Sequence, residues 1–430
     1  MLSAFLAFVA TADVRVVFAD EIEFELQTEI AASTAFARDA LQKSELSIKP
    51  RFDLRFSGGS KLTGIGFARN DFSERLEPGK LSNDVRSPQS SRIALGTHAD
   101  IELRELYLDF EIGEIQIRLG KQQVVWGQAD GLRVLDAINP LSYREFILSD
   151  LEDRRIPLWM VNAEVGIGST MLQLLWITDQ SYDEFPLDNA AFAFTAPQFR
   201  PAFNGQQPDR IRHLDKPNNW LTDSDVGLRL SAFTNGWDLT ANYLYHFQDQ
   251  PVLAIDHSTD TIVLSPTYRR THLLGGSASK AMGDFVFRSE FGYSSHRYFT
   301  SLNKPNGIEE TYEYSVVLGL DYSGITDLFI SGQFFQSTVA SNRAMLRTKN
   351  DKNISLLGRR DFANNTLSVE VLAIHNTNAS DGLVQAELAY QLSSNLTLSI
   401  GADVFYGNSE GLFGQFDRRD RLSLKLEIGL

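Results

Sequence analysis

The sequence predicts an all-β fold, a transmembrane antiparallel up-and-down β-barrel of about eighteen strands with one loop folded inward. Segments of about ten residues alternate apolar and polar side chains along most of the chain, which is typical of membrane strands. Short connections alternate with long ones, so the turns and the long loops fall on opposite rims. Residues 127–157 interrupt the alternation for too long to form a simple turn. Together these features favour a closed barrel that holds a segment in its mouth.

The alternation places each predicted strand. The strands cover residues 21–36, 44–56, 61–69, 101–111, 115–126, 158–167, 170–177, 225–233, 237–247, 271–280, 284–295, 310–322, 327–337, 353–361, 367–376, 382–391, 396–406 and 420–430. The stretch 61–69 alternates poorly, and an additional strand over 256–264 stays open. No helical segment is available to form a second layer over such strands, so closure into a barrel is the simplest way to leave no open edge.

The connections assign the two rims. Gly, Asn, Asp and Ser dominate the short ones, as tight hairpins require, for example at 57–60 and 234–236. The intervening connections are mostly longer, for example 70–100 and 178–224. An even number of strands places both chain termini on the short-turn rim.

The first two strands predict a charged lumen wall. Glu23 and Glu25 lie on the polar face of one strand, opposite Lys49, Arg51 and Arg55 of the next. Neighbours of opposite charge across a strand pair contribute roughly 0.2–1 kcal/mol each. These residues either form a solvated wall that closes the barrel seam, or create a transverse field like that of a general porin. Arg118 is a further lumen candidate.

The loop 127–157 is the main candidate for a functional site. Charged residues are interleaved with apolar ones in it. The charged candidates are Asp130, Arg133, Asp136, Arg144, Glu145, Asp150, Arg154 and Arg155. In one interpretation they form a selectivity constriction in the lumen. In the other they pair with one another and with lumen acids, which holds the loop in place. Both interpretations stay open, because a fixed loop is also a constriction.

A second long connection contains an aromatic cluster. Phe192, Phe194 and Phe199 lie between residues 183 and 205. Exposed apolar clusters mark interaction sites, so these rings are predicted to form a hydrophobic mouth that captures amphipathic cargo or dips into the outer leaflet. The alternative is a lid that packs over the 127–157 loop.

Composition excludes several classes of function. The formal net charge of −15 disfavours nucleic acid as a partner. Cysteine is absent, which excludes disulfides and thiolate metal sites. No hydrolase, zinc-protease or nucleotide-binding motif occurs, so we expect no enzyme, no metal and no cofactor. Apolar runs are too short to predict a transmembrane helix.

The chain is predicted to comprise a signal peptide over residues 1–19 and a barrel over residues 20–430. Residues 2–12 form an apolar run, and Val17-Phe18-Ala19 resembles a cleavage site, although no basic residue precedes the run. We therefore expect export.

One stretch of the chain resembles a known family. Trp126-Gly127, Asp130-Gly131, Arg133, Leu135-Asp136, Asn139-Pro140, Arg144-Glu145-Phe146 and Arg155 to Met160 carry the resemblance. It is to a proteobacterial family that is classed as a domain of unknown function and regarded as an outer-membrane barrel. Leu119 to Gln122 is also similar to a step in alginate-export and porin-like barrels, and the alternating last strand resembles those read by the barrel-assembly machinery.

The resemblance implies an integral protein of the Gram-negative outer membrane, surrounded by lipid and lipopolysaccharide. We expect a porin-like channel or transporter for a small or amphipathic solute, constricted by the 127–157 loop. Members of the family are regarded as working near RND-type permeases. The alternative is therefore a non-conducting barrel that serves as a scaffold or docking partner for an RND-type permease or a periplasmic lipid carrier.

Overall fold

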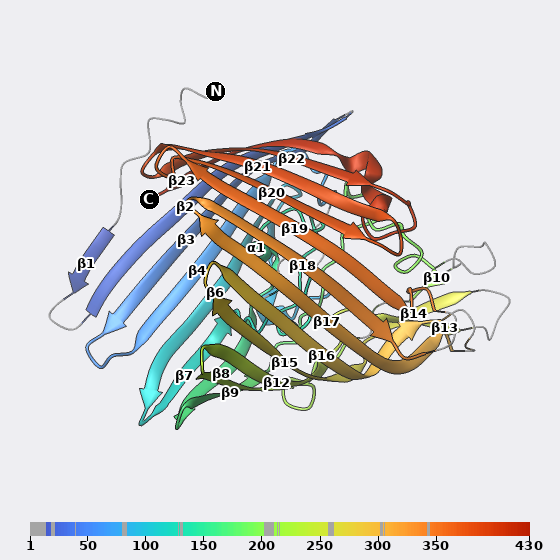
Figure 1. Ribbon diagram of the computed structural model, residues 1–430, viewed down its shortest axis with the longest axis horizontal. Helices are drawn as coiled ribbons and strands as arrows, with labels where there is room; N and C mark the ends of the chain where they lie inside the picture. Colours follow the sequence, from blue (N-terminus) through green and yellow to red (C-terminus); the bar gives the residue numbers. More distant parts are fainter. Residues whose placement is uncertain are drawn as a thin grey trace.

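The computed structural model is a closed β-barrel (Figure 1). Within the part of the chain that the structure describes, twenty strands form one antiparallel sheet, which β2 and β23 close by pairing with each other. Two of the twenty, β1 and β5, are short additions at strand edges, so eighteen strands form the wall, as predicted. The described residues are 14–18, 22–38, 40–79, 84–127, 129, 132–201, 210–212, 214, 216–256, 262–301, 304, 306–341 and 345–430.

Each wall strand corresponds to one of the predicted segments, but β7 ends at Gln122 and not at 126, because residues 123–126 already belong to the inward segment. The first nine are β2 (Ile22–Ala37), β3 (Ala40–Phe56), β4 (Lys61–Asp71), β6 (Ala99–Ile112), β7 (Ile115–Gln122), β8 (Leu158–Ile167), β9 (Thr170–Ile177), β11 (Asp225–Thr234) and β12 (Trp237–Phe247). The other nine are β15 (Arg270–Met282), β16 (Phe285–Thr300), β17 (Ile308–Ile325), β18 (Leu328–Val339), β19 (Asn350–Phe362), β20 (Leu367–Asn376), β21 (Asp381–Ser393), β22 (Leu396–Tyr406) and β23 (Arg421–Gly429). The poorly alternating stretch that begins at Lys61 is a wall strand too.

Smaller elements lie outside the wall. They are β1 (Val14–Phe18), β5 (Ile93–Leu95), β10 (Arg210–Ile211), β13 (Val252–Asp256), β14 (Val263–Thr267), the helix α1 (Leu151–Arg154) and the 3-10 helices η3 (Pro88–Ser90) and η4 (Gly414–Arg419). None of the described helices is long and apolar enough to cross a membrane.

The wall has an apolar outer face and a more polar inner face, because side chains alternate along each strand. In β17, Leu318 and Leu320 are exposed on the outside, whereas Val317 and Asp321 are buried on the inside. Exposed apolar side chains recur on the outer face of the other strands, as lipid contact requires.

The two rims differ as predicted. The hairpin between β11 and β12 turns at Asn235 and Gly236, which both have positive φ, as a two-residue turn matched to strand twist requires. The β2–β3 connection on the long-loop rim is also tight, because these strands pair as far as Ala37 and Ala40. The C-terminus lies at the short-turn rim, and the small elements β10, β13 and β14 lie at the other (Figure 1).

Most of the open stretch 256–264 lies outside the described residues. The flanking strands β13 and β14 form a separate three-stranded sheet with β10. Each has five residues and spans about 17 Å, which is too short for the apolar band of a membrane.

Most of the predicted signal peptide lies outside the described residues. The described part, β1, pairs with Ile22–Leu26 of β2. Further along the same edge of β2, residues 29–37 pair with β23 and close the barrel. Thr28 and Leu430 exchange backbone hydrogen bonds of 2.8 Å where β23 ends.

Candidate functional site

The segment 123–157 folds into the lumen between β7 and β8. Asn139 holds its two ends together, because its Oδ1 accepts from the Val124 N–H at 2.9 Å and its Nδ2 donates to the Ile156 carbonyl at 2.9 Å. Leu141 and Arg155 form an antiparallel bridge beside it. These contacts therefore hold the two ends of the inward loop together.

The first part of the loop packs on one side of the wall. Trp126, Val134 and Leu135 join an apolar cluster with inward side chains of β8, β9, β12, β15 and β17. The Trp126 Nε1 donates to the Gln173 Oε1 of β9 at 2.7 Å. This side of the lumen is filled by apolar contact.

Wall glycines make room for this cluster. A Cβ at Gly227 would lie 2.9 Å from the Trp126 ring, and one at Gly292 would lie 2.9 Å from Val134 Cγ1. A Cβ at Gly275 would lie 2.5 Å from Leu135 Cδ2. The glycines thus allow the loop to lie directly against the strands, which the sequence pattern alone did not reveal.

The middle of the loop packs on the opposite side, near the long-loop rim. Phe146 is buried and has a positive φ of 55°. Its ring contacts those of Phe194, Phe405 and Phe416, and Phe192 contacts the last two. The aromatic connection therefore packs over the loop.

This packing corrects the expectation of an open hydrophobic mouth at Phe192 and Phe194. Their side chains are 0% and 5% exposed, because Phe146 of the loop and the β22–η4 rings cover them. Phe199 is only partly buried at the edge of the same cluster. The lid alternative describes this arrangement.

Ion pairs attach the loop to a third part of the wall. Arg144 lies 2.8 Å from Glu45, 3.0 Å from Asp71 and 2.7 Å from Glu77. Glu145 lies 2.6 Å from Lys43 and 2.7 Å from Arg421. Burial alone would raise the pKa of Glu145, but Lys43 and Arg421 outweigh burial and hold that pKa well below its usual range.

Ion pairs and hydrogen bonds also fix the end of the loop. Arg155 pairs with Asp136 at 2.7 Å within the loop, and Lys49 pairs with Asp153 at 2.9 Å. Arg104 of β6 donates to the carbonyls of residues 152, 153 and 155 at 2.9–3.1 Å. The ion-pair interpretation thus describes Arg144, Glu145, Asp136 and Arg155, while Arg133 donates instead to the Asn139 carbonyl at 3.1 Å.

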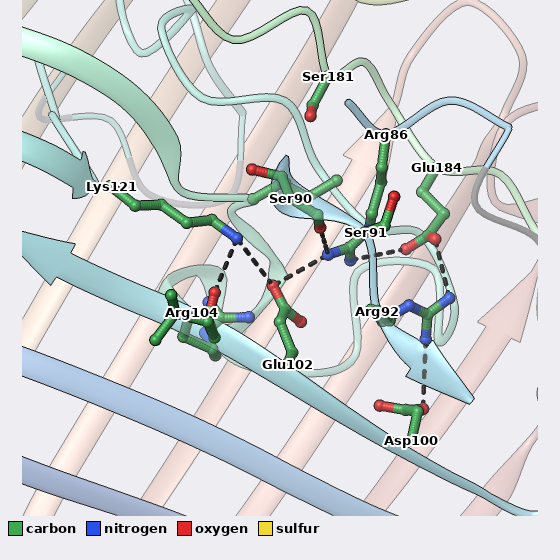
Figure 2. A network of polar contacts seen from close by, with 12 residues as sticks. Arg86, Ser90, Ser91, Arg92, Asp100, Glu102, Arg104, Lys121, Ser181 and Glu184 are labelled. Carbon is green, nitrogen blue, oxygen red and sulfur yellow. Dashed lines mark hydrogen bonds and ion pairs between the residues drawn. The ribbon is translucent and has the colours of Figure 1, made fainter. Parts of the chain in front are cut away.

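A second polar network, which the sequence analysis missed, lies beside this attachment (Figure 2). Arg86 lies 2.9 Å from Glu102, and Arg92 lies 2.8 Å from Glu184 and 3.5 Å from Asp100. Figure 2 also shows Lys121 directed at Glu102. The arginines come from the 72–98 connection, so they fasten a second long connection over the lumen.

A cavity of about 280 Å³ remains between the loop and the wall. Its lining is largely polar and charged and comes from β2, β3, β4, β6 and β21–β23 on one side and from the loop on the other. Loop residues in the lining are Ser142, Arg144, Glu145, Leu148, Ser149, Asp150, Asp153 and Arg154; wall residues include Glu29, Lys43, Glu45, Lys49, Phe67, Arg69, Glu102, Arg104, Glu387, Arg421 and Lys425. The structure therefore brings Arg144, Glu145, Asp150 and Arg154 together with Lys49 around one space.

The remaining predicted lumen residues lie elsewhere. Arg55 lies 4.0 Å from Glu23 and 3.9 Å from Glu25, near the short-turn rim. Arg51 pairs with Asp53 at 3.3 Å. The same local pairing holds for Arg118, which lies 2.6 Å from Asp109. Asp130 lies outside the described residues.

No group of three or more His, Asp or Glu side chains within the described ranges could hold a metal ion. The site is instead a polar space bounded by a fastened loop.

Comparison with known proteins supports this architecture. The profile of a family described as protein of unknown function (DUF1302) matches residues 45–397. The chain belongs to the DUF1302 family. No curated protein matches it.

The DUF1302 chain is similar in fold to solved outer-membrane channels. OccAB3 of Acinetobacter baumannii superposes with a TM-score of 0.53 at 11% identity, over 96% of this chain and 100% of that one. OccK5 (OpdH) of Pseudomonas aeruginosa gives a TM-score of 0.52 at 11% identity, over 96% and 99%. OpdK of Pseudomonas aeruginosa, solved with vanillate, gives 0.50 at 13% identity, over 96% and 100%. At such identities the likeness establishes a porin-like barrel.

Proposed function

We propose that this DUF1302 protein is an outer-membrane channel that passes a small or amphipathic solute through a lumen narrowed by residues 123–157. The observation that carries the proposal is the cavity between loop and wall, which is lined by charged side chains on both sides. A polar lining supports passage of hydrated or charged groups, and rings of charged side chains give pores their selectivity. The porin-like fold supports a channel rather than an enzyme.

The loop is suited to set the width of such a passage. It is attached by apolar clusters to two parts of the wall and by ion pairs to a third, so it lies across the lumen as a fixed partition. An eighteen-stranded barrel with nothing inside leaves an aqueous channel, so the space beside the loop defines what can pass.

The main alternative is a barrel that does not conduct and serves as a scaffold for an RND-type permease or a lipid carrier. The two apolar clusters favour it, because they close much of the lumen to water. Conductance separates the two proposals.

The experiment is single-channel recording of the purified protein and of a variant that lacks residues 129–153. We expect small, discrete openings from the wild type and a larger conductance from the variant. Heat-modifiable migration in gels establishes that each protein has assembled. An assembled wild type without openings, compared with an openly conducting variant, contradicts the channel and supports the scaffold.

A further inference from the structure

Arg154 occupies an unusual position in the cavity. It is the last residue of α1, its side chain is buried, and it lines the cavity between loop and wall. Its Nε has no hydrogen-bond partner, and its guanidinium forms no ion pair with any described residue. A guanidinium has five N–H donors in a planar fork, so a buried one without an acceptor lacks a compensating group.

Each of the other arginines of the described lining has at least one side-chain partner, although the Nε of Arg86 and of Arg92 also lacks one. Arg144 and Arg421 pair with carboxylates, as do Arg69, Arg86 and Arg92. Arg104 donates to three backbone carbonyls. Only Arg154, within the part of the lining that the structure describes, directs a buried guanidinium at the cavity without a partner.

The charges around Arg154 give no substitute for an acceptor. Burial lowers the pKa of Arg154 to about 10; Tyr143 opposes this shift, whereas Arg133 and Arg155 add to it. Asp150 acts on it from a distance but forms no ion pair, and its side chain is exposed. An added anion would therefore relieve both the missing acceptor and the repulsion between neighbouring cations.

The rest of the lining indicates what kind of anion fits. Ser142 and Ser149 supply hydroxyl groups on the loop side. Phe67 and Leu148 supply apolar surface in the same cavity. Exposed Asp150 and Glu387 disfavour a solute with two negative charges, whereas a single carboxylate matches the guanidinium fork.

We propose that this cavity binds a small amphipathic monocarboxylate whose carboxylate pairs with Arg154 and whose apolar part lies against Phe67 and Leu148. The inference deepens the proposed function and rests on it for passage of the solute, but the binding site itself would persist in a barrel that does not conduct.

The test is calorimetric titration of the assembled full chain, in a non-ionic detergent, with hexanoate, its neutral amide hexanamide, and inorganic phosphate. We expect the wild type to bind hexanoate at least about tenfold more tightly than the other two, because hexanamide cannot form the ion pair and phosphate has no apolar part. Equal binding of hexanoate and hexanamide, tighter binding of phosphate, or no binding of hexanoate overturns the proposal.

Variants locate the site. Arg154→Gln is expected to lower hexanoate affinity about tenfold and to leave hexanamide unchanged. The matched control Arg118→Gln also removes one lumen cation, but outside the cavity, and is expected to bind like the wild type. Unchanged hexanoate binding by an assembled Arg154→Gln, or an equal loss in both variants, overturns the assignment.

Two further readouts keep the outcomes separate. If Arg154→Gln does not assemble, Arg154→Lys takes its place, because lysine keeps the positive charge. The preference of the wild type for hexanoate over hexanamide and phosphate then still tests the proposal. Single-channel recording addresses the proposed function: hexanoate binding without conductance contradicts the channel alone, and conductance without hexanoate binding contradicts the carboxylate site alone.

Discussion

At the scale of single residues, the loop depends on close fits that leave no space for a larger side chain. Asn139 closes the loop by two hydrogen bonds to backbone groups, and Arg155 neutralises buried Asp136. Gly227 on β11 allows the Trp126 ring to reach the wall, where it donates to Gln173. Such positions tolerate little change in volume, because protein interiors are close-packed.

Gly227→Leu is expected to destabilise the barrel by about 1–3 kcal/mol, the usual cost of forcing extra volume into a packed core. The matched control is Gly358→Leu, because a Cβ at Gly358 meets no atom within 4 Å. Urea midpoints of the refolded proteins measure the difference. Equal midpoints for the two variants would show that Trp126 does not pack against β11.

At the scale of elements, the 123–157 segment behaves as one unit with three attachments. Its first part packs on β8–β17, its Phe146 packs under the aromatic connection and β22, and its charged residues meet β3, β4 and β23 through wall partners such as Lys43, Asp71 and Arg421. The charged attachment depends on pH, whereas the apolar attachments do not.

The pH dependence has a definite sign. The pKa of Glu145 is lowered in the folded state from its ordinary value of 4.5, so its pairing stabilises the fold above pH 4.5 and is lost as the pH falls below that value. We expect the urea midpoint of the wild type to exceed that of Glu145→Gln at pH 7, and the gap to shrink below pH 4.5. The exposed Glu410→Gln serves as the control. A gap that stays constant from pH 7 to pH 3 contradicts this role of Glu145.

At the scale of the whole molecule, the closed sheet sorts its connections between two rims. Tight turns such as 113–114 and 235–236 lie on one rim, and the connections that carry the aromatic cluster and η4 lie on the other. Longer loops face the cell exterior in bacterial outer-membrane barrels. We therefore expect the lumen site to lie beneath the exterior rim.

Because the chain has no cysteine, single-cysteine variants report the orientation directly. Thr97→Cys, Asn218→Cys and Ser409→Cys are exposed on the long-loop rim and should react on intact cells with a thiol reagent that cannot cross membranes. Gly58→Cys, Glu114→Cys and Ser394→Cys lie in short turns and should react only after permeabilisation. The reverse labelling pattern would mean that the barrel has the opposite orientation in the membrane.

The strands of the wall could be predicted from the sequence alone. Alternation is a local property of each strand, so the segments that begin at Leu158, Trp237 and Leu396 were predicted with the bounds that the structure has. The same alternation predicted which side chains of β2 and β3 face the lumen. Glu23 lies opposite Arg55 because the two strands form one hairpin, whose register is a local property.

The contacts that the loop makes inside the lumen could not be predicted from the sequence, because they depend on tertiary structure. Arg144, Arg154 and Arg155 have the same side chain in one short stretch, yet two are paired and one faces a cavity without a partner among the described residues. The difference arises because their environments come from remote strands: Glu145 meets Arg421 across 276 positions of the chain. Burial of Phe192 likewise depends on rings that β22 and η4 bring across the rim. Contacts of that kind follow from barrel closure, which places strands side by side irrespective of their spacing in the sequence.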